Sequence, residues 1–327
     1  MTNAYASAPG KIILFGEHAV VYGRPALAVP VTQVHADVEV RDSDRAGIWI
    51  DAPDVKLHAE LNTLPSDHPL ASVIHNFLFI SRNRADIVPV GQRGDGEAKA
   101  RHFPNLNVKI SSTIPVASGL GSGAAVTVAL VRALSSFLFH PMSDDEVNAF
   151  TYDIEKLHHG TPSGIDNTVV TYARPVYFVK GQPMEIFHAG KPFTIVIGDT
   201  GISAPTRESV GDVRKLWQAD PVKWEKVFDE IGTIVKPARE IIEIGEWERL
   251  GDLMNANHEQ LQKMTVSSPE LDALVDAARK AGALGAKMSG GGRGGNMIAL
   301  VTPEGAESVS RALKEAGARN TIVTQIS

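Results

Sequence analysis

A glycine- and serine-rich segment that leads directly into a long apolar stretch is the feature that most restricts how this chain can fold. Residues 114–125 read IPVASGLGSGAA, and residues 124–139 are nearly all apolar. Glycine permits positive φ and removes the side chain, so successive backbone N–H groups of such a loop can converge on one anion. The apolar stretch predicts a buried helix, whose N-terminus adds positive partial charge. The segment therefore predicts a phosphate-binding loop; a tight strand-to-helix turn without a ligand is the alternative.

The spacing within this loop excludes two common nucleotide-binding motifs. No Lys-Ser or Lys-Thr pair follows its last glycine, as a P-loop requires, and glycine at every second position breaks the G-x-G-x-x-G spacing of dinucleotide folds. The serines can add hydroxyl donors or an oxygen ligand for a metal. The residues that we expect to bind the phosphate-bearing cofactor are Pro115, Ser118, Gly119, Leu120, Gly121, Ser122, Gly123 and Ala124.

Composition excludes several classes of function. The 327 residues are 43% apolar and 21% charged, as in ordinary globular proteins, and their length is that of about two domains. A net charge of −6 argues against a nucleic-acid coat or a polybasic membrane binder. The absence of cysteine from the sequence rules out disulfides, thiolate metal sites and cysteine nucleophiles. Without a long apolar span or a signal-peptide pattern, we expect a cytoplasmic protein.

Hydrophobic periodicity predicts an α+β fold rather than a doubly wound sheet, because strands and helices do not alternate strictly. The predicted strands cover residues 33–40, 105–111, 167–172, 176–179, 193–198, 283–289, 297–301 and 321–326. The predicted helices cover residues 69–80, 124–139, 143–159, 221–245, 246–264, 269–282 and 303–317. Ser143 and Glu146 form a capping box for one helix, whose apolar face is Val147, Phe150, Ile154 and Leu157. Residues 91–99 read as a solvated loop, and the expected domains are 1–190 and 191–327.

A second segment, residues 8–23 (APGKIILFGEHAVVYG), places polar groups at both ends of a short apolar run. Lys11 precedes the run, and Glu17 and His18 follow it. A strand with polar residues at both ends can supply these groups to a buried site. The alternative for Lys11 is a solvated lysine at a strand end. The alternative for Glu17 and His18 is that they are ordinary loop residues or a pair in the core whose polar groups satisfy each other.

The third segment, residues 159–167 (HGTPSGIDN), joins the capped helix to an apolar stretch. A carboxylate at Asp166, just after a glycine-containing turn, can accept a hydroxyl proton, as a kinase requires. An ordinary Asx turn is the alternative. Glu155 lies near the end of the preceding helix, where it can supply a Mg²⁺ ligand or remain a solvated helix carboxylate.

The fourth segment, residues 287–296 (KMSGGGRGGN), has five glycines in six positions. Propensity does not account for them, because each glycine destabilises ordered backbone by roughly 0.5–1 kcal/mol relative to alanine. The backbone is therefore expected to approach a ligand closely, and Arg293 offers a planar fork suited to phosphate. A flexible glycine hairpin is the alternative. The expected phosphate-proximal residues are Ser289, Gly290, Gly291, Gly292 and Arg293.

In this order and at these separations, the four segments resemble the GHMP kinase superfamily, and within it the branch that phosphorylates mevalonate. The likeness extends from Ala8 to Val301. GEHAVVYG at residues 16–23 and HGTPSGIDN at residues 159–167 are its most discriminating parts, whereas the two glycine loops mark the superfamily as a whole.

The resemblance implies ATP-dependent phosphorylation of the 5-hydroxyl of (R)-mevalonate, an early step of isoprenoid synthesis. It implies an N-terminal α/β domain with a left-handed βαβ crossover, a ferredoxin-like C-terminal domain, and a homodimer. By the same resemblance, Asp166 and Lys11 are catalytic, Glu155 binds Mg²⁺, and the substrate-pocket residues are Glu17, His18, Ser163 and Thr206. The cofactors are then ATP and Mg²⁺, and neither nucleic acid nor a membrane is expected as a partner.

Three positions depart from the family pattern. Gly123 stands where the family commonly has a metal-binding serine, so the metal oxygen must come from Ser122, Glu155, water or ATP. Arg293 replaces a usual glycine. Ala204 stands where animal members have arginine, which removes one expected contact to an anionic substrate.

Phosphoryl transfer requires mainly positioning and charge neutralisation. We expect residues 118–123 and the following helix to hold the ATP phosphates and Lys11 to stabilise charge on the γ-phosphoryl. Asp166 accepts the hydroxyl proton or only orients the hydroxyl. The alternatives are another GHMP kinase, such as a mevalonate 3-kinase or a phosphomevalonate kinase, and a non-catalytic ligand sensor on the same scaffold.

Overall fold

The computed structural model describes residues 3–84, 105–115, 118–159, 162–203 and 206–327. The chain divides into two compact units, each assembled from segments that are distant in sequence. Unit 1 comprises Met1–Ala8, Ala36–Thr113 and Gly123–Pro162, and unit 2 comprises Pro9–His35, Ile114–Ser122 and Ser163–Ser327. The boundary at residue 190 concerns the two family domains and stays a prediction. The loop expected at residues 91–99 lies outside the described residues.

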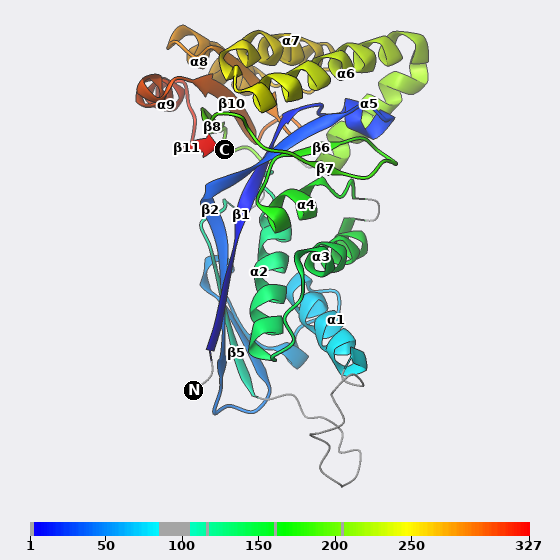
Figure 1. Cartoon of the computed structure of the whole chain (residues 1–327), viewed down its shortest axis with the longest axis vertical. Helices are drawn as coiled ribbons and strands as arrows, with labels where there is room; N and C mark the ends of the chain where they lie inside the picture. The colour runs from blue at the N-terminus through cyan, green and yellow to red at the C-terminus, as the bar shows by residue number, and fades with distance from the viewer. Residues whose placement is uncertain (1–2, 85–104, 116–117, 160–161, 204–205) are drawn as a thin grey trace. The chain divides into compact units, whose positions relative to one another are not determined.

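Unit 1 combines a sheet with three helices (Figure 1). Its strands are β3 (Ile48–Ala52), β4 (Leu57–Glu60), β5 (Leu106–Ser112) and the C-terminal part of β2 (Ala26–Asp42), in the order β4-β3-β5-β2. β5 pairs antiparallel with β2 and parallel with β3. The helices are α1 (Pro69–Arg84), α2 (Ser122–Phe137) and α3 (Asp144–His159). The left-handed crossover expected in this region stays a prediction.

The predicted buried helix is confirmed as α2, which is buried on several faces because its sequence is apolar all round. The capping box of α3 is confirmed as well. Ser143 N donates to Glu146 Oε2 at 2.8 Å, and Glu146 N donates to Ser143 Oγ at 3.3 Å. The apolar face of α3 includes Phe150, which meets Phe77 of α1 edge-on, but Leu157 is 64% exposed and lies off that face.

Unit 2 contains a four-stranded antiparallel sheet in the order β11-β8-β10-β9. The strands are β8 (Phe193–Asp199), β9 (Gly285–Ser289), β10 (Asn296–Val301) and β11 (Asn320–Ile326). Helices α5 (Thr206–Ala219), α6 (Pro221–Ile244), α7 (Leu250–Lys263) and α8 (Pro269–Lys280) connect β8 to β9, and α9 (Ala306–Glu315) connects β10 to β11. This succession and strand order are the ferredoxin-like arrangement, as expected.

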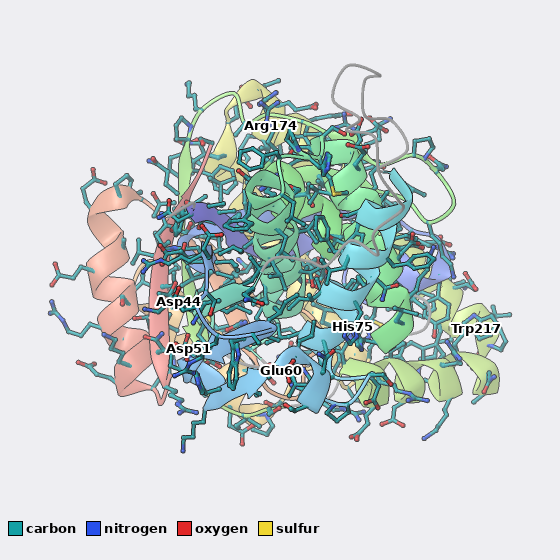
Figure 2. The ribbon with its side chains drawn as sticks, turned by 90° about the horizontal axis from the view of Figure 1, so that it is seen from below. Asp44, Asp51, Glu60, His75, Arg174 and Trp217 are labelled. Atoms are coloured by element: carbon teal, nitrogen blue, oxygen red, sulfur yellow. The ribbon has the colours of Figure 1, made fainter. Side chains whose placement is uncertain are left out.

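The rest of unit 2 is built on β1 (Asn3–Phe15) and the N-terminal part of β2, two long paired strands that contribute to both units. β2 also pairs with β6 (Val176–Phe178), which pairs with the short β7 (Glu185–Ile186). After β1, Tyr22 stacks on Phe228 of α6, with ring centroids 4.1 Å apart, and lies 5.6 Å from Trp217 of α5. Trp217 of α5 is labelled in Figure 2.

One predicted strand is wrong. Residues 167–172 belong to helix α4 (Ile165–Tyr172). The run Thr168–Thr171 is β-branched and so favours a strand locally, but Gly164 starts a helix and burial of these side chains holds it. Helix α5 was not predicted, because its sequence is mostly polar and only Ser209 and Val213 of it are buried. Lys11 lies within β1 rather than at its end.

None of the helices in the described part of the chain has the length and apolarity that a membrane crossing needs.

Two helical glycines provide a test of close packing in unit 2. A Cβ on Gly251 of α7 would lie 2.3 Å from the carbonyl oxygen of Leu284, whereas a Cβ on Gly211 of α5 would meet nothing within 4 Å. We expect Gly251→Ala to lower the free energy of unfolding by about 1–3 kcal/mol. Gly211→Ala is the matched control and should raise it by about 0.5–1 kcal/mol. Urea denaturation measures both; a Gly251→Ala protein as stable as the wild type would contradict the packing described.

Candidate functional site

Lys11 and Asp166 form an ion pair inside unit 2. The Lys11 side chain is 8% exposed, and its ammonium needs a partner because burying an unpaired charge is costly. Lys11 Nζ lies 3.0 Å from Asp166 Oδ1. The Asp166 side chain is 38% exposed. Part of this carboxylate therefore stays accessible to a ligand while the rest meets the ammonium.

The turn that starts α4 places Asp166. Gly164 has a φ of 87°, in the left-handed region that glycine adopts without strain. Ile165 N donates to Ser163 Oγ at 3.2 Å, which satisfies one amide at the helix start. Asp166 follows in the first turn, where the helix dipole favours a negative charge. Ser163, a predicted substrate-pocket residue, thus also shapes the turn that holds Asp166.

The predicted phosphate loop lies against the same lysine. Lys11 N donates to the carbonyl oxygen of Leu120 at 2.9 Å. Gly121 has a φ of 74°, and a Cβ there would lie 2.8 Å from Lys11 Cγ, so only glycine fits over this side chain. Gly119 has a φ of 80° and open space beside it. Residues 116–117 lie outside the described residues.

Ser118, at the start of this loop, has two separate anchors. Ser118 Oγ donates to the carbonyl oxygen of Pro115 at 2.8 Å, which closes the turn before the glycines. The carbonyl oxygen of Ser118 accepts a hydrogen bond from Asn296 Nδ2 at the start of β10. The loop is therefore tied both to itself and to the second glycine segment, within unit 2.

Gly123, in the first turn of α2, lies beside Glu155, and both residues belong to unit 1. Ser122 begins α2, Ala124 is buried, and a Cβ on Gly123 would lie 3.8 Å from Glu155 Oε1. The absence of a side chain at Gly123 leaves room beside this carboxylate. No group of three or more His, Asp or Glu side chains that could hold a metal occurs among the described residues. The predicted metal-binding residues, Glu155 and Ser122, fit Mg²⁺, which proteins usually bind through one or two carboxylates together with phosphate oxygens.

The second glycine segment is the loop of a β-hairpin between β9 and β10, in which Ser289 pairs with Asn296. Its glycines are required by close contacts. A Cβ on Gly292 would lie 2.0 Å from the carbonyl oxygen of Val266, and one on Gly291 would lie 2.8 Å from Thr206 Oγ1. Thr206, a predicted substrate-pocket residue, is the exposed first residue of α5. Ala204, where a departure from the family was noted, lies outside the described residues.

Arg293 of this loop is also fixed in unit 2. Its φ is 59°, its N–H donates to the carbonyl oxygen of Val266 at 2.7 Å, and its Nη1 pairs with Asp212 of α5. Hydrogen bonds from Lys215 and Arg293 lower the pKa of Asp212 to about 2. The Arg293 side chain is 36% exposed, so it can still reach an anion.

Glu17 and His18 contact the same hairpin. A Glu17 carboxylate oxygen pairs with Lys287 Nζ, and neither side chain is more than 1% exposed. His18 Nε2 lies 3.1 Å from the carbonyl oxygen of Gly291. Burial raises the pKa of Glu17, lowers the pKa of Lys287 and lowers the pKa of His18 to about 4. His18 is therefore neutral near pH 7.

Unit 2 thus brings together most of the predicted site: Lys11, Glu17, His18, the loop 118–122, Ser163, Asp166, Thr206 and the loop 289–293. Gly123, Ala124 and Glu155 belong to unit 1. Backbone amides, a cation and a half-exposed carboxylate in one unit suit a reaction in which phosphate charge is neutralised and a hydroxyl is oriented.

Sequence reasoning missed Lys287 and Asn296 as members of this arrangement. A charged side chain at Lys287 is unexpected, because all five residues of β9 are buried. A lysine inside the apolar pattern of residues 283–289 was the available signal. Asn296 gave none, because its contact with Ser118 spans 178 positions of sequence.

Comparisons with known proteins agree with this description. The GHMP kinases N terminal domain family matches residues 93–174, and the GHMP kinases C terminal family matches residues 238–319. Mevalonate kinase of Thermococcus sibiricus is 37% identical over 98% of this chain and 96% of its own length, and that of Pyrococcus furiosus is 36% identical over the same shares.

Solved structures give the same result. The crystal structure of L. major mevalonate kinase in complex with R-mevalonate has a TM-score of 0.83 and 29% identity, covering 100% of this chain and 96% of that chain. The Methanococcus jannaschii mevalonate kinase has a TM-score of 0.80 and 26% identity, covering 99% and 98%.

The fold and these matches define the class, a kinase that phosphorylates a small molecule. The chain belongs to the GHMP kinase family, in the branch formed by the mevalonate kinases. Members of this family use ATP as the phosphoryl donor.

The buried His18 predicts how stability depends on pH. Its pKa is about 4 in the folded protein and 6.5 in the reference state, so between these values the unfolded chain binds a proton that the folded protein does not. His18 therefore lowers the free energy of unfolding as pH falls from about 6.5 to 4, by at most ~1.4 kcal/mol per pH unit. Urea denaturation at several pH values should show a smaller slope for His18→Gln than for the wild type; equal slopes would contradict the burial of a neutral histidine.

Proposed function

We propose that this chain transfers the γ-phosphoryl group of ATP to the 5-hydroxyl of (R)-mevalonate. The observation that carries the proposal is the Lys11–Asp166 pair, 3.0 Å apart, in the unit that also holds the loop 118–122. The full-length likeness to proteins named mevalonate kinase, one solved with R-mevalonate, supports mevalonate as the acceptor.

Asp166 is the residue that would receive or orient the proton of the attacking hydroxyl. Its carboxylate is held by the first turn of α4 on one side and by Lys11 on the other, and it retains exposed surface. Lys11 would hold this carboxylate in place and stabilise negative charge on the phosphoryl group during transfer. A fixed cation in a dry setting is effective because it needs no reorganisation when the charge develops.

Residues 118–123 and the start of α2 would hold the phosphates of ATP. Gly119 and Gly121 have positive φ values, which suit a loop whose backbone amides converge on an anion, and the helix N-terminus adds its positive end. Glu155, which faces Gly123, and the Ser122 hydroxyl are the residues proposed to hold Mg²⁺. When bound, the ion would neutralise charge on the β- and γ-phosphate oxygens.

The remaining predicted residues are proposed to form the substrate side of the site. Ser163 and Thr206 offer hydroxyl groups, and Thr206 lies against Gly291. His18, neutral near pH 7, offers ring nitrogens rather than a positive charge. The hairpin loop 289–293, with Arg293, would lie near the transferred phosphate.

Three broader expectations stay predictions: family domains at residues 1–190 and 191–327, a homodimer, and a cytoplasmic location.

A panel of acceptors tests the proposed function. ADP release would be measured with ATP, Mg²⁺ and, separately, mevalonate, phosphomevalonate, galactose and homoserine. We expect turnover with mevalonate above all the others, and phosphorus NMR of the product should show a phosphate ester on the 5-oxygen. A product phosphorylated on the 3-oxygen, or a preference for phosphomevalonate, would refute the proposal.

Substitution of Asp166 tests its proposed role. Asp166→Asn keeps a hydrogen-bond acceptor for Lys11 but removes the negative charge, so kcat should fall about 10²- to 10⁴-fold while the affinity for ATP changes little. Asp153→Asn, on the exposed side of α3, is the control and should leave kcat unchanged. Steady-state kinetics and equilibrium nucleotide binding separate the two effects. An Asp166→Asn enzyme with near-normal kcat would show that the carboxylate is not required.

A further inference from the structure

The ion pair between Glu17 and Lys287 is buried to an unusual degree for two charged groups. Their side chains are 1% and 0% exposed, and Lys287 Nζ also donates to the carbonyl oxygen of Met288 at 2.7 Å. Removing two charges from water costs free energy that their attraction only partly returns. Such a pair is best explained by what it positions.

The pair joins two segments that are 270 positions apart in sequence. Two further contacts connect the same segments. Ser289 Oγ donates to the carbonyl oxygen of Ile13 at 2.7 Å, and His18 Nε2 lies 3.1 Å from the carbonyl oxygen of Gly291. The end of β1 and the turn after it are therefore attached to β9 and to the hairpin loop at three successive points.

The turn after β1 needs such support because its backbone is strained. His18 has a φ of 60°, an uncommon conformation for a residue with a side chain. Gly16 has a φ of 94°, and a Cβ there would lie 2.4 Å from the carbonyl oxygen of Pro25. A strained turn persists only where the surrounding structure over-determines it.

We propose that Lys287 is a positioning residue for phosphoryl transfer. Its ammonium binds Glu17 and thereby holds the turn at residues 16–18 against the hairpin loop 290–295. This contact fixes the position of the hairpin loop. This inference rests on the proposed function, in which the hairpin lies near the transferred phosphate. Glu17 then acts through its contact with the hairpin, whereas His18 keeps a ring nitrogen for a ligand.

Lys287→Met tests the proposal because it keeps the length of the side chain and leaves the Glu17 carboxylate buried without a cation. The KM for ATP should rise about tenfold or more at pH 8, since an uncompensated buried charge displaces what surrounds it. kcat measured at saturating ATP should fall less than the ratio kcat/KM.

The defect should also depend on pH. Burial already raises the pKa of Glu17, and loss of Lys287 removes the attraction that opposes this rise. The carboxyl group is then neutral at low pH, where the packing is tolerated, and ionises as pH increases through its raised pKa. The other titratable or charged groups near the pair are His18, His258 of α7, Asp272 and Arg279 of α8, and Arg293. They are common to wild type and variant, so the ratio of the two activities reports Glu17.

A double variant makes the test independent of a folding failure. Glu17→Gln with Lys287→Met removes both charges, and neutral replacements of a buried pair are often tolerated. We expect this protein to fold, because no unpaired charge is left in the core, and to show an activity ratio that does not change with pH. Its KM for ATP should stay at least about threefold above that of the wild type, because the contact that fixes the turn is gone. Lys263→Met, in an exposed pair with Glu230, is the matched control and should match the wild type throughout.

Two measurements separate this inference from the proposed function. Binding of a fluorescent ATP analogue and thermal unfolding, each from pH 5.5 to 8.5, require no acceptor substrate. For Lys287→Met, the affinity for the nucleotide analogue and the midpoint temperature of unfolding should both fall, relative to the wild type, as pH rises. A wild-type level of nucleotide binding with no pH trend in Lys287→Met would overturn the inference. So would a double variant that fails to fold, or one whose KM for ATP equals that of the wild type.

Discussion

The burial of Lys11 is the constraint on which the arrangement of the site depends. Its ammonium lies inside unit 2 and requires a carboxylate, which Asp166 supplies at 3.0 Å. Its aliphatic stem requires neighbours without side chains, which Gly121 supplies. One residue of β1 therefore fixes both the start of α4 and the path of the loop 118–121. The proposed acid–base group and the proposed phosphate loop meet because each satisfies a different part of the same side chain.

The glycines of the two loops follow from contacts rather than from flexibility. In the hairpin, Gly291 and Gly292 lie so close to Thr206 and to the carbonyl oxygen of Val266 that any Cβ would collide. The hairpin loop is therefore packed against α5 and against the segment that follows α7. The sequence left a flexible glycine hairpin as the alternative. It is a hairpin, but its backbone is held. A held backbone can present amides to an anion without first losing conformational entropy.

The sequence was sufficient for features that depend on neighbouring residues. The capping box of Ser143 and Glu146, the buried helix α2 and the glycine-rich turns are local signals, and each predicted element is present. It failed where packing overrides propensity, as in α4, whose β-branched residues form a helix because their burial and the turn at Gly164 favour it. It also missed Lys287, because the partner that allows a charge inside β9 lies 270 positions away.

Exposure distinguishes the two lysine–carboxylate pairs of unit 2. Both join segments that are far apart in sequence, and both place a lysine below 10% exposure. Asp166 retains 38% of its side-chain exposure, whereas Glu17 retains 1%. A carboxylate that must meet a substrate hydroxyl needs open surface, and one that only fixes a turn does not. The same ion-pair chemistry thus serves two purposes in one unit, and the accessible surface of the acid decides which pair can take part in the reaction.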